Sequence, residues 1–345
     1  MKKIIFGLAI LFIWVGLTSI STAQELKAIK LIYSNNMPAM AGGNIFFEKI
    51  WIPKINNEIA KFGYKLDFTN YHASSLYKYP DQVNACEKGL IDATNFVVAW
   101  EEARAPLHLV LNLPMMGFTA HVSTDTWFDL QDTIPEFGDE FSKYVELFHF
   151  STAPSVFNMN AVRRVPADFK GVKVYATGAM ADFFKSIGAT PLRIDAPDWY
   201  SSMDRGMVDV LPMGAFIISM WKLQEVAKVH VIPTGDALYW TSLSYIMNRK
   251  KFEQFPQEVQ KVIKDNVRWA STEMTEMDEK NRVRSEKMFE EIGNQVIRLT
   301  PEEMKLWHDA AQPTHDNWIK EMESKGLPGK KVYDETKRLI KKYSK

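Results

Sequence analysis

The side chains best placed for chemistry lie where a predicted strand turns into a helix. Val172–Ala176 is rich in strand-forming residues, Thr177-Gly178 interrupts it, and a helical run follows over Ala179–Ile187. In parallel α/β sheets, the loops at the carboxyl ends of the strands face the ligand. Tyr175 leaves the strand toward such a loop, and its phenol offers one hydrogen-bond donor and a flat apolar face. These residues predict the binding of a small molecule.

Sequence motifs for catalysis and for cofactor binding are missing. The sequence contains no Gly-x-Ser-x-Gly, His-Glu-x-x-His, Gly-x-Gly-x-x-Gly or Gly-x-x-x-x-Gly-Lys-[Ser/Thr]. His308 and His315 share a predicted helix with Glu303, but not in the pattern of a zinc helix. We therefore expect no catalysis, no cofactor and no metal ion. The alternative is a secreted α/β hydrolase or isomerase, which would need a reactive constellation that the sequence does not reveal.

The charges of the chain are balanced. Lys+Arg and Asp+Glu both number 42 among 345 residues, so the formal net charge is zero. Nucleic-acid-binding proteins usually carry a basic excess, so we expect no nucleic-acid partner. The single cysteine, Cys86, lies in a helical pattern and predicts a buried, inert thiol. Stability must then come from a large apolar core and not from intramolecular disulfides.

The first 23 residues have the pattern of an export signal. Lys2 and Lys3 precede the apolar run Ile4–Leu17, and Ser21-Thr22-Ala23 supplies small residues for cleavage. The apolar run is short for a membrane span, so we favour a cleaved signal peptide over an uncleaved anchor. The mature protein is expected to be soluble and exported.

Two parts of the sequence alternate strands with helices. The first half has the order β-α-β-α-β, predicted over Ala28–Ser34, Asn44–Phe62, Tyr64–Tyr71, Pro80–Lys88 and Gly89–Asn95. In the second half, Val172–Ala176 and Thr190–Ile194 are each followed by a helix, the latter ending near Gly206. This alternation predicts two α/β domains with largely parallel sheets.

Further segments are expected to connect the two domains. Strand patterns at Val145–Phe150, Phe157–Met159 and Leu243–Met247 lie where the chain would pass between them. The helical pattern Pro256–Met288 is long enough to span both domains. Two more helices are predicted over Pro301–Ser324 and Lys330–Tyr343.

Short motifs in a fixed order give the mature sequence a family resemblance. It resembles the periplasmic solute receptors of tripartite ATP-independent periplasmic (TRAP) transporters. The matching segments, with the family pattern in parentheses, are His72–Leu76 (Pro-x-Ser-Gln-Leu), Cys86–Asp92 (x-x-x-Gly-x-x-Asp), Leu113-Pro114 (Leu-Pro), Asp168–Val174 (Asp-Leu-Lys-Gly-x-Lys-x), Gly188–Pro191 (Gly-Ala-x-Pro) and Arg205–Asp209 (Arg-Gly-x-Val-Asp). Each motif is weak alone, and their shared order and spacing carry the resemblance.

The resemblance implies a two-domain α/β solute-binding fold with an interdomain cleft, a long domain-spanning helix and no catalysis. We expect domain I to comprise 24–152 plus 239–279, and domain II to comprise 153–238 plus 280–345. The implied partners are a small organic ligand and the permease subunits of a TRAP transporter, with the receptor itself a monomer. A sensor receptor of the same fold, with a signalling partner in place of the permease, is an open alternative.

The sequence departs from the family where the ligand would bind. Most members carry, directly after Gly-x-Lys-x, an arginine that pairs with the substrate carboxylate, and here that residue is Tyr175. Asn95 and Val97 end the strand where a carboxylate side chain is frequent, Ser155 replaces a second arginine, and Met213 replaces an asparagine. Aromatic surface near the same cleft is expected from Trp100, Tyr239 and Trp240.

These departures predict an unusual ligand, because burying a carboxylate without a partner costs several kcal/mol. One possibility is that another cation replaces the arginine; Arg163, Arg164 and Arg193 are nearby in sequence, and we favour Arg193 because the other two precede Pro166 in a loop that is expected to be exposed. The other is that a neutral or zwitterionic head group is bound by Asn36, Asn95, Ser155 and Tyr175. Aromatic residues favour stacking on a planar or apolar body. We therefore predict an organic acid with an aromatic or hydrophobic body, and a quaternary amine held by aromatic rings is the alternative.

Overall fold

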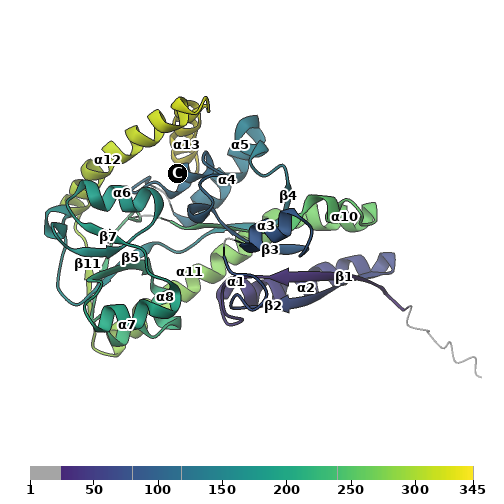
Figure 1. Cartoon of the computed structure of the whole chain (residues 1–345), viewed down its shortest axis with the longest axis horizontal. Coiled ribbons are helices and arrows are strands. Elements are labelled where there is room, and N and C mark those ends of the chain that lie inside the picture. The colour runs from purple at the N-terminus through teal and green to yellow at the C-terminus, as the bar shows by residue number, and fades with distance from the viewer. Residues whose placement is uncertain (1–24, 80, 118, 239, 345) are drawn as a thin grey trace, which may run out of the picture.

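The computed structural model describes residues 25–79, 81–117, 119–238 and 240–344. The predicted signal peptide, residues 1–23, therefore lies outside the described residues. Two β-sheets, each covered by helices, form two lobes (Figure 1). We call them lobe A, built on the five-stranded sheet, and lobe B, built on the six-stranded sheet. The predicted two-domain α/β class is confirmed.

The sheet of lobe A has the order β2-β1-β3-β10-β4. Its strands are β1 (Lys27–Ser34), β2 (Tyr64–Tyr71), β3 (Ala93–Val97), β4 (Tyr144–Ser151) and β10 (Ser242–Asn248). β1 is parallel to β2 and β3, whereas β10 is antiparallel to β3 and β4. Its helices are α1 (Gly42–Phe46), a π-helical turn (Phe47–Trp51), α2 (Ile52–Ile59), α3 (Asp81–Glu87), α4 (Ala120–Thr133), α5 (Pro135–Asp139), α9 (Arg249–Phe252) and α10 (Gln257–Asp265), with 3₁₀ turns at Ala60–Phe62, Val98–Trp100 and His108–Asn112.

The sheet of lobe B has the order β11-β9-β5-β8-β6-β7. Its strands are β5 (Ser155–Met159), β6 (Lys173–Tyr175), β7 (Thr190–Leu192), β8 (Val210–Gly214), β9 (Val229–Ile232) and β11 (Gln295–Arg298). β6 is parallel to β7 and β8, and β5 is antiparallel to β8 and β9. Its helices are α6 (Gly178–Ser186), α7 (Trp199–Asp204), α8 (Ala215–Met220) and α12 (Pro301–Ser324), with 3₁₀ turns at Pro166–Phe169, Ala196–Asp198 and Leu223–Glu225.

The long helix α11 (Val267–Glu291) joins the lobes. It packs against β4 and α4 in lobe A and against α8 and β11 in lobe B (Figure 1). The predicted spanning helix is thus confirmed, but it begins only after a break at Asn266. The amide of Asn266 donates to Glu58 Oε2 (2.9 Å) and to the carbonyl of Val262 (2.9 Å), which stabilises the turn between α10 and α11.

The C-terminal helices return toward lobe A. α12 contacts α6 of lobe B, whereas α13 (Gly329–Tyr343) packs against α4 of lobe A. Leu339 and Ile340 of α13 share an apolar core with Trp127 of α4. The predicted domain division, which gives all of 280–345 to domain II, stays a prediction, and this segment contacts both lobes.

The predicted strand Gly89–Asn95 is shifted along the chain. Gly89 has a positive φ of 71° and ends the turn after α3, so the strand begins only at Ala93. Cys86 lies in α3, before this turn. Its side chain is fully buried, and burial raises the pKa of its thiol to about 12. The predicted buried thiol is therefore confirmed.

None of the helices in the described parts of the chain combines the length and the apolar composition that a membrane span requires.

The core of lobe B is built around Trp307 of α12. This side chain is fully buried, and its ring centre lies 4.9 Å from that of Phe157 and 5.2 Å from that of Phe169. Its indole N–H donates to the carbonyl of Arg164 at 2.8 Å. One side chain thus connects α12 to the sheet and to the loop before β6.

We predict that Trp307→Ala lowers the free energy of unfolding by about 3–5 kcal/mol, because it opens a cavity in a packed aromatic cluster. Leu306→Ala is the control, because Leu306 is the adjacent residue in the helix and its side chain is 49% exposed. This variant should change the free energy of unfolding by less than about 1 kcal/mol. Urea unfolding followed by circular dichroism measures both, and equal losses would contradict the assignment of Trp307 to the core.

Candidate ligand-binding site

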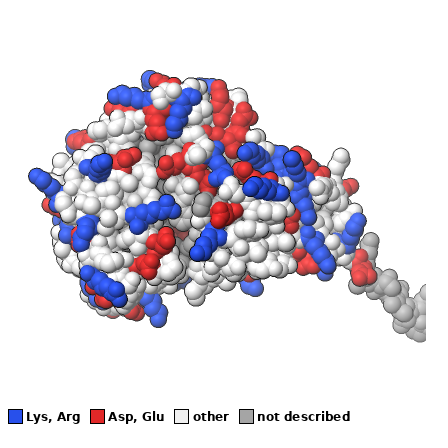
Figure 2. Space-filling view, viewed as in Figure 1, with Lys and Arg blue, Asp and Glu red and all other residues white. Residues whose placement is uncertain are grey.

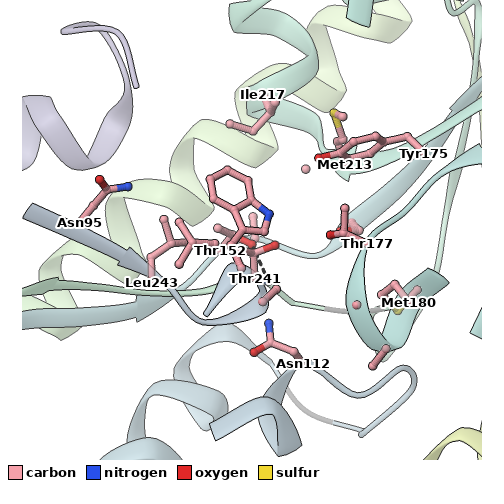
Figure 3. A pocket seen from close by; sticks show the side chains of 18 of the residues that line it. Asn95, Asn112, Thr152, Tyr175, Thr177, Met180, Met213, Ile217, Thr241 and Leu243 are labelled. Carbon is pink, nitrogen blue, oxygen red and sulfur yellow. Dashed lines mark hydrogen bonds between the residues drawn. The ribbon is translucent and has the colours of Figure 1, made fainter. Parts of the chain in front are cut away.

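A cavity of about 180 Å³ lies between the two lobes (Figure 3). Lobe A and the connecting segments supply Met37, Asn95, Val97, Ala99, Trp100, Glu102, Leu109, Asn112, Thr152, Ala153, Thr241 and Leu243, lobe B supplies Ser155, Tyr175, Thr177–Met180, Trp199, Met213, Gly214, Phe216 and Ile217, and α11 supplies Asp278. The site is therefore complete only when both lobes and the spanning helix are in place.

Strand direction explains why these residues meet. β3, β6 and β8 run toward the cavity, so their carboxyl ends place Asn95, Tyr175 and Met213 in its wall. β5 is antiparallel to β8, so its first residue, Ser155, lies at the same edge. Figure 3 shows Asn95 and Tyr175 on opposite sides of the cavity, with Thr152 between them.

Aromatic rings form much of the cavity surface. The rings of Tyr175 and Trp199 meet edge to face at 5.7 Å, and the indole N–H of Trp199 donates to the carbonyl of Ile194 at 3.1 Å. On the other lobe, Trp100 contacts Tyr79 edge to face at 4.9 Å and remains 37% exposed. These contacts orient large apolar surfaces toward a shared space.

The described wall of the cavity contains acidic side chains but no cationic ones. Among the described residues that line it, none is Lys, Arg or His, and two are carboxylic acids, Glu102 and Asp278. Burial raises the pKa of Asp278 to about 6, although the N–H of Ala153 donates to its Oδ2 at 2.6 Å. Burial also raises the pKa of Glu102, and the charges of Glu321 and Asp182 add to this effect. The arginine of the family pattern has no substitute in this wall.

Figure 2 shows Lys and Arg side chains interspersed with Asp and Glu over the face it presents. Arg282 of α11 and Arg164 of lobe B already have partners. Arg282 pairs with Glu279 and Glu286, and Arg164 pairs with Glu303. No group of three or more His, Cys, Asp or Glu side chains that could hold a metal ion occurs in the described parts of the chain.

Neutral polar groups at the cavity differ in how they are held. Asn95 is fixed on both sides, because its Oδ1 accepts from Gln82 Nε2 at 2.7 Å and its Nδ2 donates to Asn36 Oδ1 at 3.1 Å. Asn112 donates to the carbonyl of Trp240 at 2.6 Å. Thr177 precedes α6, its hydroxyl does not cap the helix, and Thr177–Met180 line the cavity, so the start of α6 forms part of the wall.

The structure brings together six of the residues proposed from the sequence: Asn95, Val97, Trp100, Ser155, Tyr175 and Met213 all line the cavity. Asn36 lies behind Asn95 as its hydrogen-bond partner, and Trp240 is buried in the core of lobe A. Arg193 is exposed and is not in the cavity wall, since β7 ends one residue before it at the edge of the sheet. Tyr239 lies outside the described residues. Ligand contact by all ten residues remains a prediction.

Other lining residues were missed from the sequence. Thr177–Met180 follow β6 directly, so the strand-to-helix turn could have indicated them. Phe216 and Ile217 begin α8 in the same way after β8. Asp278 gave no comparable signal, because it stands in a polar stretch of a long helix and only the crossing of that helix brings it to the cavity.

Comparison with known proteins places this geometry in a family. Residues 57–321 match the model of the bacterial extracellular solute-binding proteins, family 7. A solute-binding protein of Albidiferax ferrireducens is 23% identical over 264 residues, which cover 72% of this chain and 74% of that protein.

Solved structures of TRAP solute-binding proteins share the fold. One from an unidentified marine microbe, specific for aromatic acids and solved with metahydroxyphenylacetate, has a TM-score of 0.84 and 25% identity, covering 92% of this chain and 100% of its own. One from Rhodoferax ferrireducens with copurified benzoate has a TM-score of 0.83 and 20% identity, covering 92% and 98%. One from Bordetella bronchiseptica with bound mandelate has a TM-score of 0.79 and 20% identity, covering 91% and 99%.

The two sheets, the spanning helix, the cavity between the lobes and the family match over residues 57–321 lead to one conclusion. This chain belongs to family 7 of the bacterial extracellular solute-binding proteins, the receptors of TRAP transporters.

Proposed function

We propose that this receptor captures a small organic acid with an aromatic or apolar body in the periplasm and delivers it to the membrane subunits of a TRAP transporter. The observation that carries the proposal is the cavity wall, to which Trp100, Tyr175, Trp199 and Phe216 contribute rings and in which no described residue is cationic. Structurally similar receptors bind benzoate, hydroxylated aromatic acids and mandelate, which supports the same ligand class here. Export by the predicted signal peptide 1–23 and a monomeric state are part of this proposal.

The size of the cavity favours a single ring. An apolar cavity of about 150 Å³ is known to hold benzene. The cavity here measures about 180 Å³, so it offers room for one ring with a short substituent. A sugar acid of comparable size would bring several hydroxyl groups against an apolar wall, and each one left without a partner would cost free energy.

The carboxylate of such a ligand needs donors other than arginine. The first turn of α6, Gly178–Met180, lies in the wall and presents N–H groups that have no partner within the helix. The N-terminus of a helix favours anions, and the hydroxyls of Thr177 and Ser155 stand in the same wall. Glu102 lies beside Gly178 and would repel an anion when ionised, an effect that its raised pKa weakens.

Contacts between the lobes support closure around the ligand. Gly178 of α6 lies close to Ala99 and Glu102 of lobe A, and on the other side Gly42 of α1 lies close to Phe216 of α8. A ligand that touches both walls stabilises this arrangement over an open one, because its contacts are complete only when the lobes meet.

Ligand screening by isothermal titration calorimetry tests the proposal. The receptor is unfolded and refolded first to remove copurified ligand, then titrated with benzoate, 3-hydroxybenzoate, mandelate, succinate and glucuronate. We expect the aromatic acids to bind at least about 10-fold more tightly than succinate or glucuronate, because only they fill the apolar wall. Tighter binding of succinate than of every aromatic acid would refute the ligand class, and turnover of any bound acid would refute a receptor role.

We predict that Tyr175→Ala weakens binding of the preferred aromatic acid roughly 10-fold, because it removes one ring face from the wall. Tyr200→Ala is the matched control, since Tyr200 is a nearby tyrosine that is 39% exposed and does not line the cavity. Titration calorimetry should show no change for the control. Unchanged affinity in Tyr175→Ala would show that this ring does not contact the ligand.

We predict that Gly178→Ala weakens binding of an aromatic acid, whereas its loss of stability is no larger than that of a control glycine variant outside the cavity. Gly178 has a φ of 57°, and an added Cβ would collide with the carboxylate of Glu102 at the start of α6. Gly206→Ala is the control, because Gly206 has a similar φ of 63°, has open space around an added Cβ and lies outside the cavity wall. The free energy of unfolding should fall by about 1 kcal/mol in both variants. A similar change in affinity for the aromatic acid in both variants would argue that the N-terminus of α6 does not bind the ligand carboxylate.

A further inference from the structure

Asp278 stands out among the polar groups of the cavity. It lines the wall from α11, and only 8% of its surface is exposed. Its Oδ2 accepts from the N–H of Ala153 at 2.6 Å. Within the described parts of the chain, no hydrogen bond or ion pair is found for its Oδ1, so this oxygen is open to a donor in the cavity that Asp278 lines.

The neighbourhood of Asp278 does not neutralise its charge. The nearest cation on the same helix is Arg282, whose guanidinium is held by Glu279 and Glu286. Burial raises the pKa of this carboxyl to about 6, whereas the hydrogen bond from the Ala153 N–H favours its ionised form. An ionised carboxylate has about four acceptor positions, and a single N–H leaves most of them open. Such a group is stabilised by any donor that enters the cavity.

Asp278 reaches the cavity from α11, whereas the donors of the proposed carboxylate site lie at the start of α6. Ala153 belongs to the short crossover between β4 and β5, next to Thr152, which Figure 3 shows near the middle of the cavity. Thr177 at the start of α6 lies on the Tyr175 side in the same view. The wall thus offers N–H donors at one place and an anionic acceptor at another.

We infer that Asp278 is a specificity-determining residue that accepts a hydrogen bond from a hydroxyl or amino group on the ring of the ligand. The inference rests on the proposed function and narrows its ligand class to aromatic acids that carry such a donor. An unsubstituted ring leaves the acceptor without a partner, whereas a ring hydroxyl or amino group supplies one. Sites with a buried polar group discriminate strongly against ligands that lack the matching group.

A purely structural role for Asp278 makes a different prediction. The bond to Ala153 ties α11 to the crossover, and its loss would affect every ligand alike. Asp278→Asn keeps an oxygen that can accept from the Ala153 N–H but removes the negative charge. Comparing ligands with and without a ring donor in this variant separates the two roles.

The experiment measures Kd by titration calorimetry for the refolded full-length mature receptor and for Asp278→Asn. The probes are benzoate, 2-, 3- and 4-hydroxybenzoate and 3-aminobenzoate. In the unmodified receptor, the best substituted acid should bind about 10- to 100-fold more tightly than benzoate, as expected for a hydrogen bond to a charged acceptor. In Asp278→Asn this preference should fall to less than about 3-fold, while benzoate binds as well as before or better, since a negative charge has been removed.

Glu276→Gln is the matched control. It removes one negative charge from the same helix, where Glu276 pairs with Lys280 at the surface away from the cavity wall. The substituent preference should be unchanged in this variant. Thermal unfolding of all three proteins shows whether each is folded at the temperature of the titration.

Three results would overturn the inference. Equal weakening of benzoate and of the substituted acids by Asp278→Asn would assign the residue a structural role only. If the unmodified receptor binds benzoate as tightly as every substituted acid, the preference for a ring hydroxyl or amino group is refuted and the proposed function is left intact. Failure of all these acids to bind the unmodified receptor would refute the proposed function and the inference with it.

Discussion

The cavity depends on one constraint, the crossing of α11 between the two lobes. This helix packs against β4 and α4 on one side and against α8 and β11 on the other, so it sets the distance between the walls. At the crossing, Asp278 bonds to the backbone of Ala153, where the chain passes from β4 to β5. The helix, the crossover and the ligand space therefore meet at a single point, and a change in the angle between the lobes changes the cavity itself.

The electrostatic character of the wall decides what this constraint can hold. With no cation in the described wall, an anion must rely on helix N–H groups and hydroxyls, which are fixed dipoles of partial charge. Such donors bind less strongly than an arginine fork, so apolar contact has to supply more of the affinity. The fold by itself does not select the ligand, because the same two-lobed frame can present very different side chains at its strand ends.

The two rims of the cavity show how the lobes can approach. Gly178 meets Ala99 and Glu102 on one side, and Gly42 meets Phe216 on the other. Glycine lacks a Cβ, so backbone can come close to the opposite lobe at both places. Small residues where the lobes meet, together with the aromatic rings of the cavity wall, allow the lobes to approach closely around the ligand space.

The sequence by itself determined the alternation of strands and helices, the two-lobed class and the residues at strand ends. Tyr175 could be placed at the cavity because the direction of a strand is a local property of the chain, whereas Asn95 and Met213 were singled out through the family resemblance. Only the tertiary structure decided that Arg193 stands outside the wall, that α13 returns to lobe A and that Asp278 faces the ligand space. Those outcomes depend on how distant elements pack and cross, and local periodicity holds no information about the angle at which two helices or two sheets meet.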